Sequence, residues 1–263
     1  MKRLGAVLAG VLLALPAWPA GADDALQKVL DCMAANVPAT LHVEPLELQS
    51  TDRAGGSRTL KGRLYAMRGK DGEARVNLHI DAPDYLAGAA YLLRQGKPGT
   101  EDEMYVFLPS VNRVRRVVGD AGYDSLLGTD FSYVDFKQMQ SAFGGSTATL
   151  EAPQALEQQR PAYVLSFKSQ PGALSPYSLV RMWVDQKTCV ALKADFYQND
   201  TVSKELSAPA SALRQSGNYW YLGRAQMRDL QKGTSSELRI LGVDNTDELP
   251  TRLFEPRLFY LGH

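Results

Sequence analysis

The sequence predicts a mainly β protein built around one large antiparallel sheet. From about residue 41 onward, apolar residues recur at every second position, which is the pattern of half-buried strands. Turn-forming residues such as Gly, Pro, Asn and Asp separate these segments at short intervals, as they do in hairpins. A sheet of about eleven strands twists strongly, so it curls into a barrel or half-barrel, or splits.

The first residues have the organisation of a cleaved signal peptide. Lys2 and Arg3 precede an apolar stretch, residues 4–15, and Ala20-Gly21-Ala22 supplies the small residues that signal peptidase requires. The apolar stretch is shorter than the roughly 20 residues of a membrane-spanning helix. We therefore expect residues 1–22 to be removed on export to the periplasm; an uncleaved anchor is the alternative.

The exported chain, residues 23–263, is expected to form one domain without a transmembrane helix. The formal net charge of the full sequence is zero, which argues against nucleic acid as a partner.

The two cysteines of the chain, Cys32 and Cys189, predict a disulfide, because an even number of cysteines in an exported protein is usually paired in disulfides. Two buried thiols or one reactive thiol are the alternatives. Cys32 lies too far beyond the apolar stretch to be a lipoprotein anchor.

The first element expected in the exported chain is a helix that ends near Pro38. Its apolar residues have helical spacing: Leu26, Val29, Leu30 and Met33. The strands expected after it are residues 42–49, 59–68, 73–81, 87–94, a hairpin over 104–118, then 147–157, 161–168, 177–185, 189–197, 202–207, 219–229 and 235–243. The helix and a short apolar segment at 250–260 would cover the open side of the sheet.

The strand at residues 73–81 shows the alternation most clearly. Val76, Leu78 and Ile80 point to one side and are expected to be buried. His79 lies on the other, polar side, so we expect a solvated imidazole.

The stretch from residue 104 to residue 136 combines an apolar strand with three arginines. In an extended strand Arg113 and Arg115 share one face and Arg116 points to the other. They form either a solvated edge or a contact for a headgroup or partner, because guanidinium groups bind phosphate and carboxylate well.

An aromatic cluster follows the arginines. Phe131, Tyr133 and Phe136 are interpreted either as core or as the rim of a cavity. The carboxylates of Asp130 and Asp135 lie in the same segment, and we interpret them as surface groups.

No catalytic or metal-binding pattern is evident. The three histidines, His42, His79 and His263, have no ligand spacing, and no cofactor motif or nucleophile elbow is present. We therefore expect a protein that is not an enzyme and that holds neither metal nor cofactor.

Several segments resemble the outer-membrane lipoprotein-sorting proteins of the LolA-like family, in the type found beside RND/MMPL exporters. The segments that carry the resemblance are Tyr105–Pro109, Arg113–Arg116, Gly128–Tyr133 with Asp135, Gly88–Leu92, Trp183–Asp185, Leu192-Lys193 and Leu253-Phe254. The resemblance covers nearly the whole exported chain, and the central segment is its most specific part.

The resemblance implies an unclosed half-barrel with short helices as a lid over an apolar cavity. It implies a carrier that shelters the acyl chains of a lipoprotein or another lipid and passes them toward the outer membrane. An RND/MMPL-type exporter in the inner membrane and an outer-membrane acceptor would be its partners, and a lipid-sensing regulatory module is the alternative. The resemblance assigns no cargo-contacting residue to this chain. From the apolar and aromatic residues of the strands and of the segment after the arginines, the expected lipid-binding residues are Tyr91, Leu93, Val106, Leu108, Phe131, Tyr133, Phe136 and Trp183.

Overall fold

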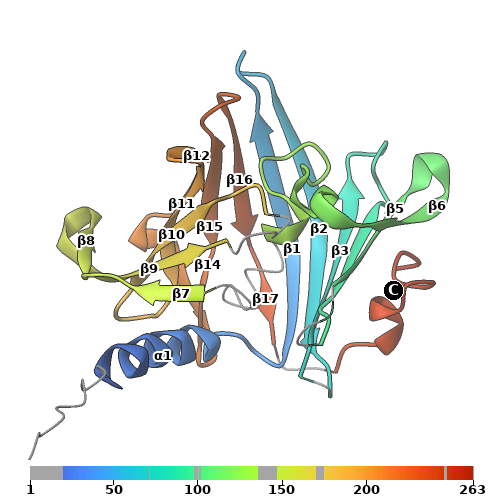
Figure 1. Cartoon of the computed structure of the whole chain (residues 1–263). Helices are drawn as coiled ribbons and strands as arrows, with labels where there is room; N and C mark the ends of the chain where they lie inside the picture. Colours follow the sequence, from blue (N-terminus) through green and yellow to red (C-terminus); the bar gives the residue numbers. More distant parts are fainter. Residues whose placement is uncertain are drawn as a thin grey trace, which may run out of the picture.

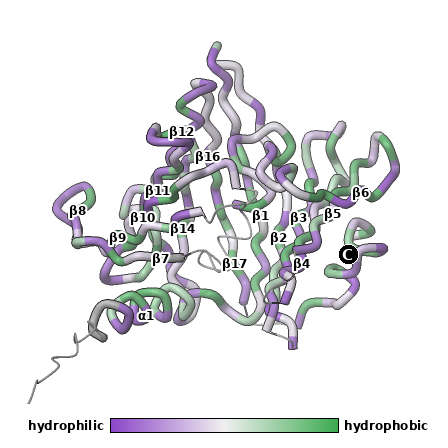
Figure 2. The backbone as a smooth tube through the Cα atoms, viewed as in Figure 1, coloured by the Kyte–Doolittle hydropathy of each residue, from purple (hydrophilic) through white to green (hydrophobic). Residues whose placement is uncertain are grey.

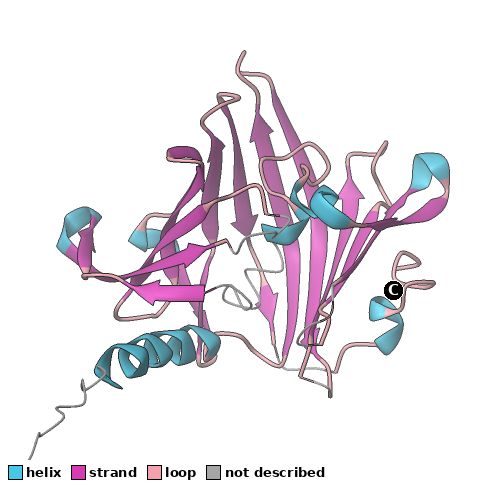
Figure 3. Cartoon of the chain, in the orientation of Figure 1, coloured by secondary structure: helices cyan, strands magenta, loops and turns pink. Residues whose placement is uncertain are grey.

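The computed structural model describes residues 20–70, 72–97, 100, 102–135, 147–169, 175–245 and 248–262. Residues 1–19, which carry most of the expected signal peptide, and Phe136 lie outside this part. The structure is one large antiparallel sheet with few helices (Figures 1 and 3). It begins with helix α1 (Ala20–Ala34), whose Val29 and Met33 are buried in the main core. The predicted N-terminal helix is therefore confirmed.

The main sheet has 15 strands, and its ends do not pair with each other, so the predicted open antiparallel sheet is confirmed. Its order is β6-β5-β4-β3-β2-β1-β16-β15-β12-β11-β10-β9-β7, with β17 beside β1 and β8 beside β9. The bounds are β1 Thr40–Thr51, β2 Ser57–Arg68, β3 Ala74–Ala82, β4 Ala90–Arg94, β5 Glu103–Leu108, β6 Arg113–Val117, β7 Thr147–Leu150, β8 Gln154–Leu156, β9 Arg160–Lys168, β10 Leu179–Asp185, β11 Ala191–Gln198, β12 Thr201–Ser207, β15 Arg224–Asp229, β16 Thr234–Ile240 and β17 Val243–Asp244.

The main sheet has more strands than the expected eleven, in part because residues 147–157 form two strands, β7 and β8, and because the short strand β17 follows β16. Residues 219–229 divide at Gly223 into β14, which lies outside the main sheet, and β15. Hydrophobic and hydrophilic residues alternate along the strands (Figure 2), and the larger core lies on the concave face. Val76, Leu78 and Ile80 belong to this core and are at most 2% exposed, as their spacing predicts.

Residues 119–135 cross the concave face, and we call them the bridge. The bridge begins after edge strand β6 with the 3-10 helix η2 (Gly119–Tyr123) and ends in a helical turn at residues 133–135. Its Leu126 and Phe131 are buried in the main core. Figure 1 shows the bridge in front of β1 and β2, so it covers part of the sheet's inner surface.

The C-terminal segment packs on the opposite, convex face. It contains the 3-10 helix η5 (Thr251–Phe254), and its apolar side chains join a second core with residues of β2, β4 and β5: Tyr65, Ala90, Leu92, Phe107, Leu253, Phe254 and Phe259. The expectation that this segment covers the open, concave side is therefore wrong. The alternation of β4 explains why, because Leu92 points away from Tyr91 and Leu93.

The same segment overturns the prediction of a solvated His79. His79 is only 4% exposed, and its Nε2 lies 2.6 Å from the carbonyl oxygen of Phe259. Asn77, on the same side of β3, donates from Nδ2 to the carbonyls of Leu253 and Phe259. These polar side chains are buried because they satisfy the backbone of a segment about 180 residues later in the chain.

Candidate functional site

An apolar cavity of about 250 Å³ lies within the concave half of the molecule. Its wall is formed by β1, β2, β10, β11, β12, β15 and β16, and its remaining sides by the end of α1, the bridge and a small hairpin. The aliphatic and sulfur-containing side chains that line it include Met33, Leu46, Leu64, Met182, Leu206, Met227, Leu238 and Ile240. Most of the lining is apolar, which suits an apolar ligand.

The hairpin over the cavity consists of β13 (Leu213–Ser216) and β14 (Tyr219–Leu222), which form a separate two-stranded sheet. It places three consecutive aromatic residues, Tyr219, Trp220 and Tyr221, on the cavity, and each remains partly exposed. This hairpin was not predicted, because the residue pattern at 219–229 favoured a single strand. Gly223, which separates β14 from β15, was the available signal.

Hydrogen bonds hold the hairpin against the rest of the cavity wall. The backbone N–H of Trp220 donates to Asn36 Oδ1 at 2.9 Å, and Asn36 Nδ2 donates to the carbonyl of Thr188 at 2.6 Å. Asn36 therefore connects the hairpin to the turn between β10 and β11. Because this turn also contains Cys189, the contacts at Asn36 lie next to the disulfide described below.

The predicted disulfide between Cys32 and Cys189 is present. The two Cα atoms are 5.8 Å apart and the sequence separation is 157 residues. The bond fastens α1 to the turn between β10 and β11, and Cys189 itself lines the cavity. The disulfide thus fixes one side of the cavity wall.

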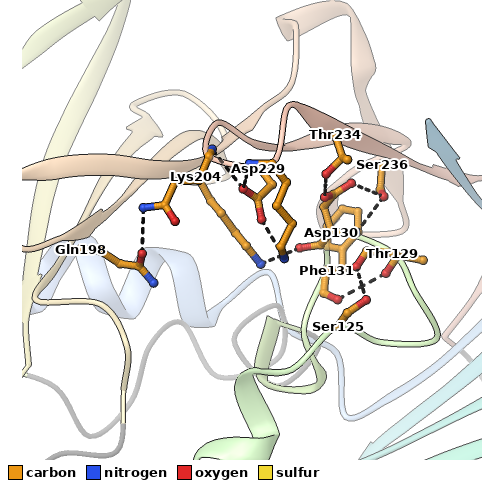
Figure 4. Close-up of polar contacts among 11 residues, drawn as sticks. Ser125, Thr129, Asp130, Phe131, Gln198, Lys204, Asp229, Thr234 and Ser236 are labelled. Carbon is orange, nitrogen blue, oxygen red and sulfur yellow. Dashed lines mark hydrogen bonds and ion pairs between the residues drawn. The ribbon is translucent and has the colours of Figure 1, made fainter. Parts of the chain in front are cut away.

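The bridge is held over the sheet by buried polar contacts (Figure 4). Asp130 accepts hydrogen bonds from the hydroxyls of Thr234 and Ser236 on β16, and its own N–H donates to Ser236 Oγ at 2.8 Å. Lys204 Nζ, on β12, donates to the Asp130 carbonyl at 2.9 Å. These contacts connect the bridge to the half of the sheet opposite its origin at β6.

A tight turn directs the bridge toward these partners. Gly128 has a φ of +78°, a conformation that glycine adopts readily, and a Cβ there would lie 2.4 Å from Arg58 Nη2. Arg58 Nη2 donates to the Leu127 carbonyl at 2.7 Å, so this guanidinium holds the turn and would have to move if residue 128 carried a side chain.

Asp135 ends the bridge on the cavity wall. Its Oδ2 accepts a hydrogen bond of 2.6 Å from the N–H of Ser132, and its own N–H donates to Ser132 Oγ. Burial raises the pKa of the Asp135 carboxyl, and the Ser132 hydrogen bonds and the charge of Lys204 partly oppose this rise. Asp130 and Asp135 are both 8% exposed, so the interpretation of this pair as surface groups is wrong.

Of the side chains predicted to bind lipid, Phe131 lines the cavity. Tyr91, Leu93, Val106 and Leu108 lie on the same face of the sheet, on β4 and β5, but they are not part of the cavity lining. Tyr91 contacts the bridge instead, since its hydroxyl donates to the Tyr133 carbonyl at 3.2 Å and the two ring centroids are 5.0 Å apart. Tyr91 and Tyr133 therefore pack the bridge against the sheet.

Trp183 points to the convex face, contrary to the expected place in the cavity. It packs with Ala162 and Val164, whereas its neighbours in β10, Met182 and Val184, belong to the main core. Lys193 Nζ lies 4.5 Å from the indole centroid, which is a cation–π contact on the outer surface.

The three predicted arginines lie on edge strand β6 and are exposed. Arg113 pairs with Leu108 and Arg115 with Val106, so both belong to the concave side, while Arg116 pairs with Tyr105 on the convex side. None of the three is among the residues that line the cavity. Contact of these arginines with a headgroup or partner stays a prediction.

In the part of the chain that the structure describes, no group of three or more His, Cys, Asp or Glu side chains could hold a metal ion. No described helix is both long enough and apolar enough to cross a membrane.

Solved structures share this fold over nearly the whole chain. A candidate outer membrane lipoprotein-sorting protein domain from Vibrio parahaemolyticus has a TM-score of 0.78 at 18% identity and covers 89% of this chain and 97% of its own. A LolA superfamily protein from Nitrosomonas europaea has a TM-score of 0.66 at 18% identity, with coverages of 87% and 96%. A DUF1329 family protein from Desulfovibrio piger has a TM-score of 0.77 at 20% identity, with coverages of 87% and 96%.

A family model with the description "-like: Uncharacterized protein" matches residues 72–259, which is more than half of the chain. The chain belongs to this LolA-like family. The match confirms the resemblance found in the sequence. The matched residues of this chain extend from β3 to the C-terminal segment. No curated protein matches the chain.

Proposed function

We propose that this LolA-like protein is a non-catalytic periplasmic carrier. It shelters an acyl chain of a lipoprotein or another lipid in its cavity and passes the cargo toward the outer membrane. The observation that carries the proposal is the apolar cavity between the curled sheet, α1, the bridge and the aromatic hairpin. The fold that it shares with a LolA superfamily protein is consistent with this role.

Physical chemistry explains why an apolar cavity serves such a task. Each methylene removed from water gains about 0.8 kcal/mol, so an acyl chain does not cross an aqueous space readily on its own. A cavity of about 250 Å³ exceeds the roughly 150 Å³ of an engineered apolar cavity that binds benzene. Release of the cargo then requires an acceptor that binds it more tightly.

Filling the cavity tests the carrier proposal directly. Ala191 is a small, partly buried lining residue on β11, and an Ala191→Phe substitution places a ring where the ligand would lie. We expect the affinity for a fluorescent acyl probe to fall by at least about tenfold, because displacing two methylenes loses about 1.6 kcal/mol. Fluorescence titration measures this change.

The matched control is Ala155→Phe, at an exposed alanine on β8 that does not line the cavity. It should bind the probe like the wild type. Equal probe affinity in the Ala191→Phe variant and the wild type, with both folded, would contradict a ligand site in the cavity. Mass spectrometry of lipid extracted from protein purified from the periplasm would identify the cargo.

We further propose that the arginines of β6 contact anionic headgroups or a partner such as an exporter or an acceptor. Reversal of charge at Arg113, Arg115 and Arg116 should slow probe transfer to anionic vesicles severalfold at low salt, since exposed charges steer association. The same reversal at Arg53, Lys187 and Arg252, which are exposed basic residues elsewhere, is the control.

Stopped-flow transfer rates to anionic and neutral vesicles separate the outcomes. Equal slowing by both triple variants would assign the effect to net charge and remove the special role of β6. A stable complex with an inner-membrane protein and no lipid transfer would instead support the alternative, a lipid-sensing regulatory module.

A further inference from the structure

The cavity contains one acidic side chain and no basic one. Among the lining residues in the part of the chain that the structure describes, Asp135 is the sole Asp or Glu, and Lys, Arg and His are absent. The other polar groups of the lining are amides, hydroxyls and the indole N–H of Trp220. Of the charged side chains that the structure describes, a charged group of a ligand inside the cavity would therefore meet only a carboxyl group.

The Asp135 side chain is held at the wall. Its carboxylate accepts the Ser132 N–H, and the Ser132 hydroxyl accepts the Asp135 N–H, so the two residues close one helical turn. Phe131, which precedes this turn in the bridge, also lines the cavity. Asp135 is 92% buried, so its carboxylate cannot be solvated as fully as a surface acid.

The surrounding charges leave the negative potential of Asp135 partly uncompensated. Among the described residues, Lys204 is the cation that acts on it, but the Lys204 ammonium donates its hydrogen bond to the Asp130 carbonyl. Burial is the main reason that the pKa values of the Tyr123 and Tyr177 phenols are raised, and the charge of Asp135 contributes to both rises. Two aromatic side chains on different segments thus experience the potential of this carboxylate.

We propose that Asp135 makes the cavity selective for apolar chains without a negative charge, such as ester- or amide-linked acyl chains, over free fatty-acid carboxylates. The inference rests on the proposed carrier function and specifies its ligand class. Its physical basis is that two carboxylates in a site of low dielectric cannot both stay ionised without a large cost. An ester or amide carbonyl at the same place adds no second charge.

The test compares ligands that share one chain length and differ only at the head: dodecanoate, methyl dodecanoate and dodecanamide. Each ligand is titrated at pH 8 against protein loaded with a fluorescent acyl probe, and the displacement of the probe is measured. Every ligand is kept below its own critical micelle concentration. Removing the charge by Asp135→Asn should strengthen dodecanoate binding by about tenfold, the equivalent of one pKa unit of interaction, and change the two neutral ligands less than twofold. Asn retains an oxygen that accepts the Ser132 N–H.

Asp124→Asn is the control, because Asp124 is an exposed acid of the same bridge that does not line the cavity. It should leave the affinity ratio of dodecanoate to methyl dodecanoate at the wild-type value. Asp135→Ser provides a second neutral variant, in case the amide disturbs the turn.

Three results would overturn the inference: an equal change for all three ligands in both Asp135 variants, an unchanged dodecanoate affinity, or the same shift in Asp124→Asn. Failure of every ligand to displace the probe, or of the probe to bind at all, would instead reject the carrier proposal, and the inference with it. Circular dichroism confirms that each variant is folded before titration.

Discussion

Loss of the Cys32–Cys189 disulfide is expected to lower the free energy of unfolding by about 2 to 5 kcal/mol. The bond closes a loop with a sequence separation of 157 residues, so its removal gives the unfolded chain much more conformational freedom. Urea denaturation of a double variant, Cys32→Ser with Cys189→Ser, measures the change from the shift in the unfolding midpoint.

The same variant should also bind the acyl probe more weakly, because the disulfide fastens α1, and Met33 of α1 lines the cavity. The natural control is a reducing agent, which should destabilise the wild type and leave the double variant unchanged. Identical midpoints for the wild type and the double variant under oxidising conditions would contradict this expectation.

Replacing Asp130 by Ala is expected to lower the free energy of unfolding by about 2 to 4 kcal/mol and to loosen the attachment of the bridge to β16, where the backbone N–H bond to Ser236 remains. The carboxylate accepts hydrogen bonds from the hydroxyls of Thr234 and Ser236, and both would lose this acceptor in a largely buried site. Because these bonds hold the bridge far from its origin at β6, we expect faster hydrogen exchange over residues 125–135. Mass spectrometry of the exchanged peptides measures the exchange rate of the bridge. Urea denaturation measures the loss of stability.

Asp124→Ala removes an acid of the same bridge at an exposed position and serves as the matched control. It should exchange at the wild-type rate. Faster exchange spread evenly over the whole Asp130→Ala chain, without a local increase in the bridge, would show that Asp130 supports global stability and not the attachment of this segment.

The sequence was sufficient for the features that depend on neighbouring residues. The alternation through Val76, Leu78 and Ile80 identified a strand and its buried face, because period-two spacing places such side chains together. The prediction failed for His79 on the same strand. Its burial depends on the carbonyl of Phe259, and no local pattern reports a contact between segments so far apart.

The apolar character of a residue also did not show on which face of the sheet its side chain lies. Trp183 follows Met182 and precedes Val184, so both sides of β10 carry apolar residues and the alternation is ambiguous. Arg181, two residues earlier on the same side of β10, was the available sign of an outer surface; in the structure it lies over the indole together with Lys193, which pairs with Trp183 from β11. The sequence therefore predicted an apolar site, and among the predicted lipid-binding residues that the structure describes, Phe131 is the one that lines the cavity.

The C-terminal segment has a mechanical consequence for the sheet that it covers. Strands β2 to β5 are supported from both sides, by the bridge on the concave face and by Leu253, Phe254 and Phe259 on the convex face. Across β9 and β10, the described outer cluster is small: Ala162, Val164 and Trp183, with Leu156 packed against them. Among the described residues, the convex face of β2, β4 and β5 therefore carries more apolar cover than that of β9 and β10. We expect local opening of the backbone to cost less free energy in the thinly covered strands, away from the turn that the disulfide holds.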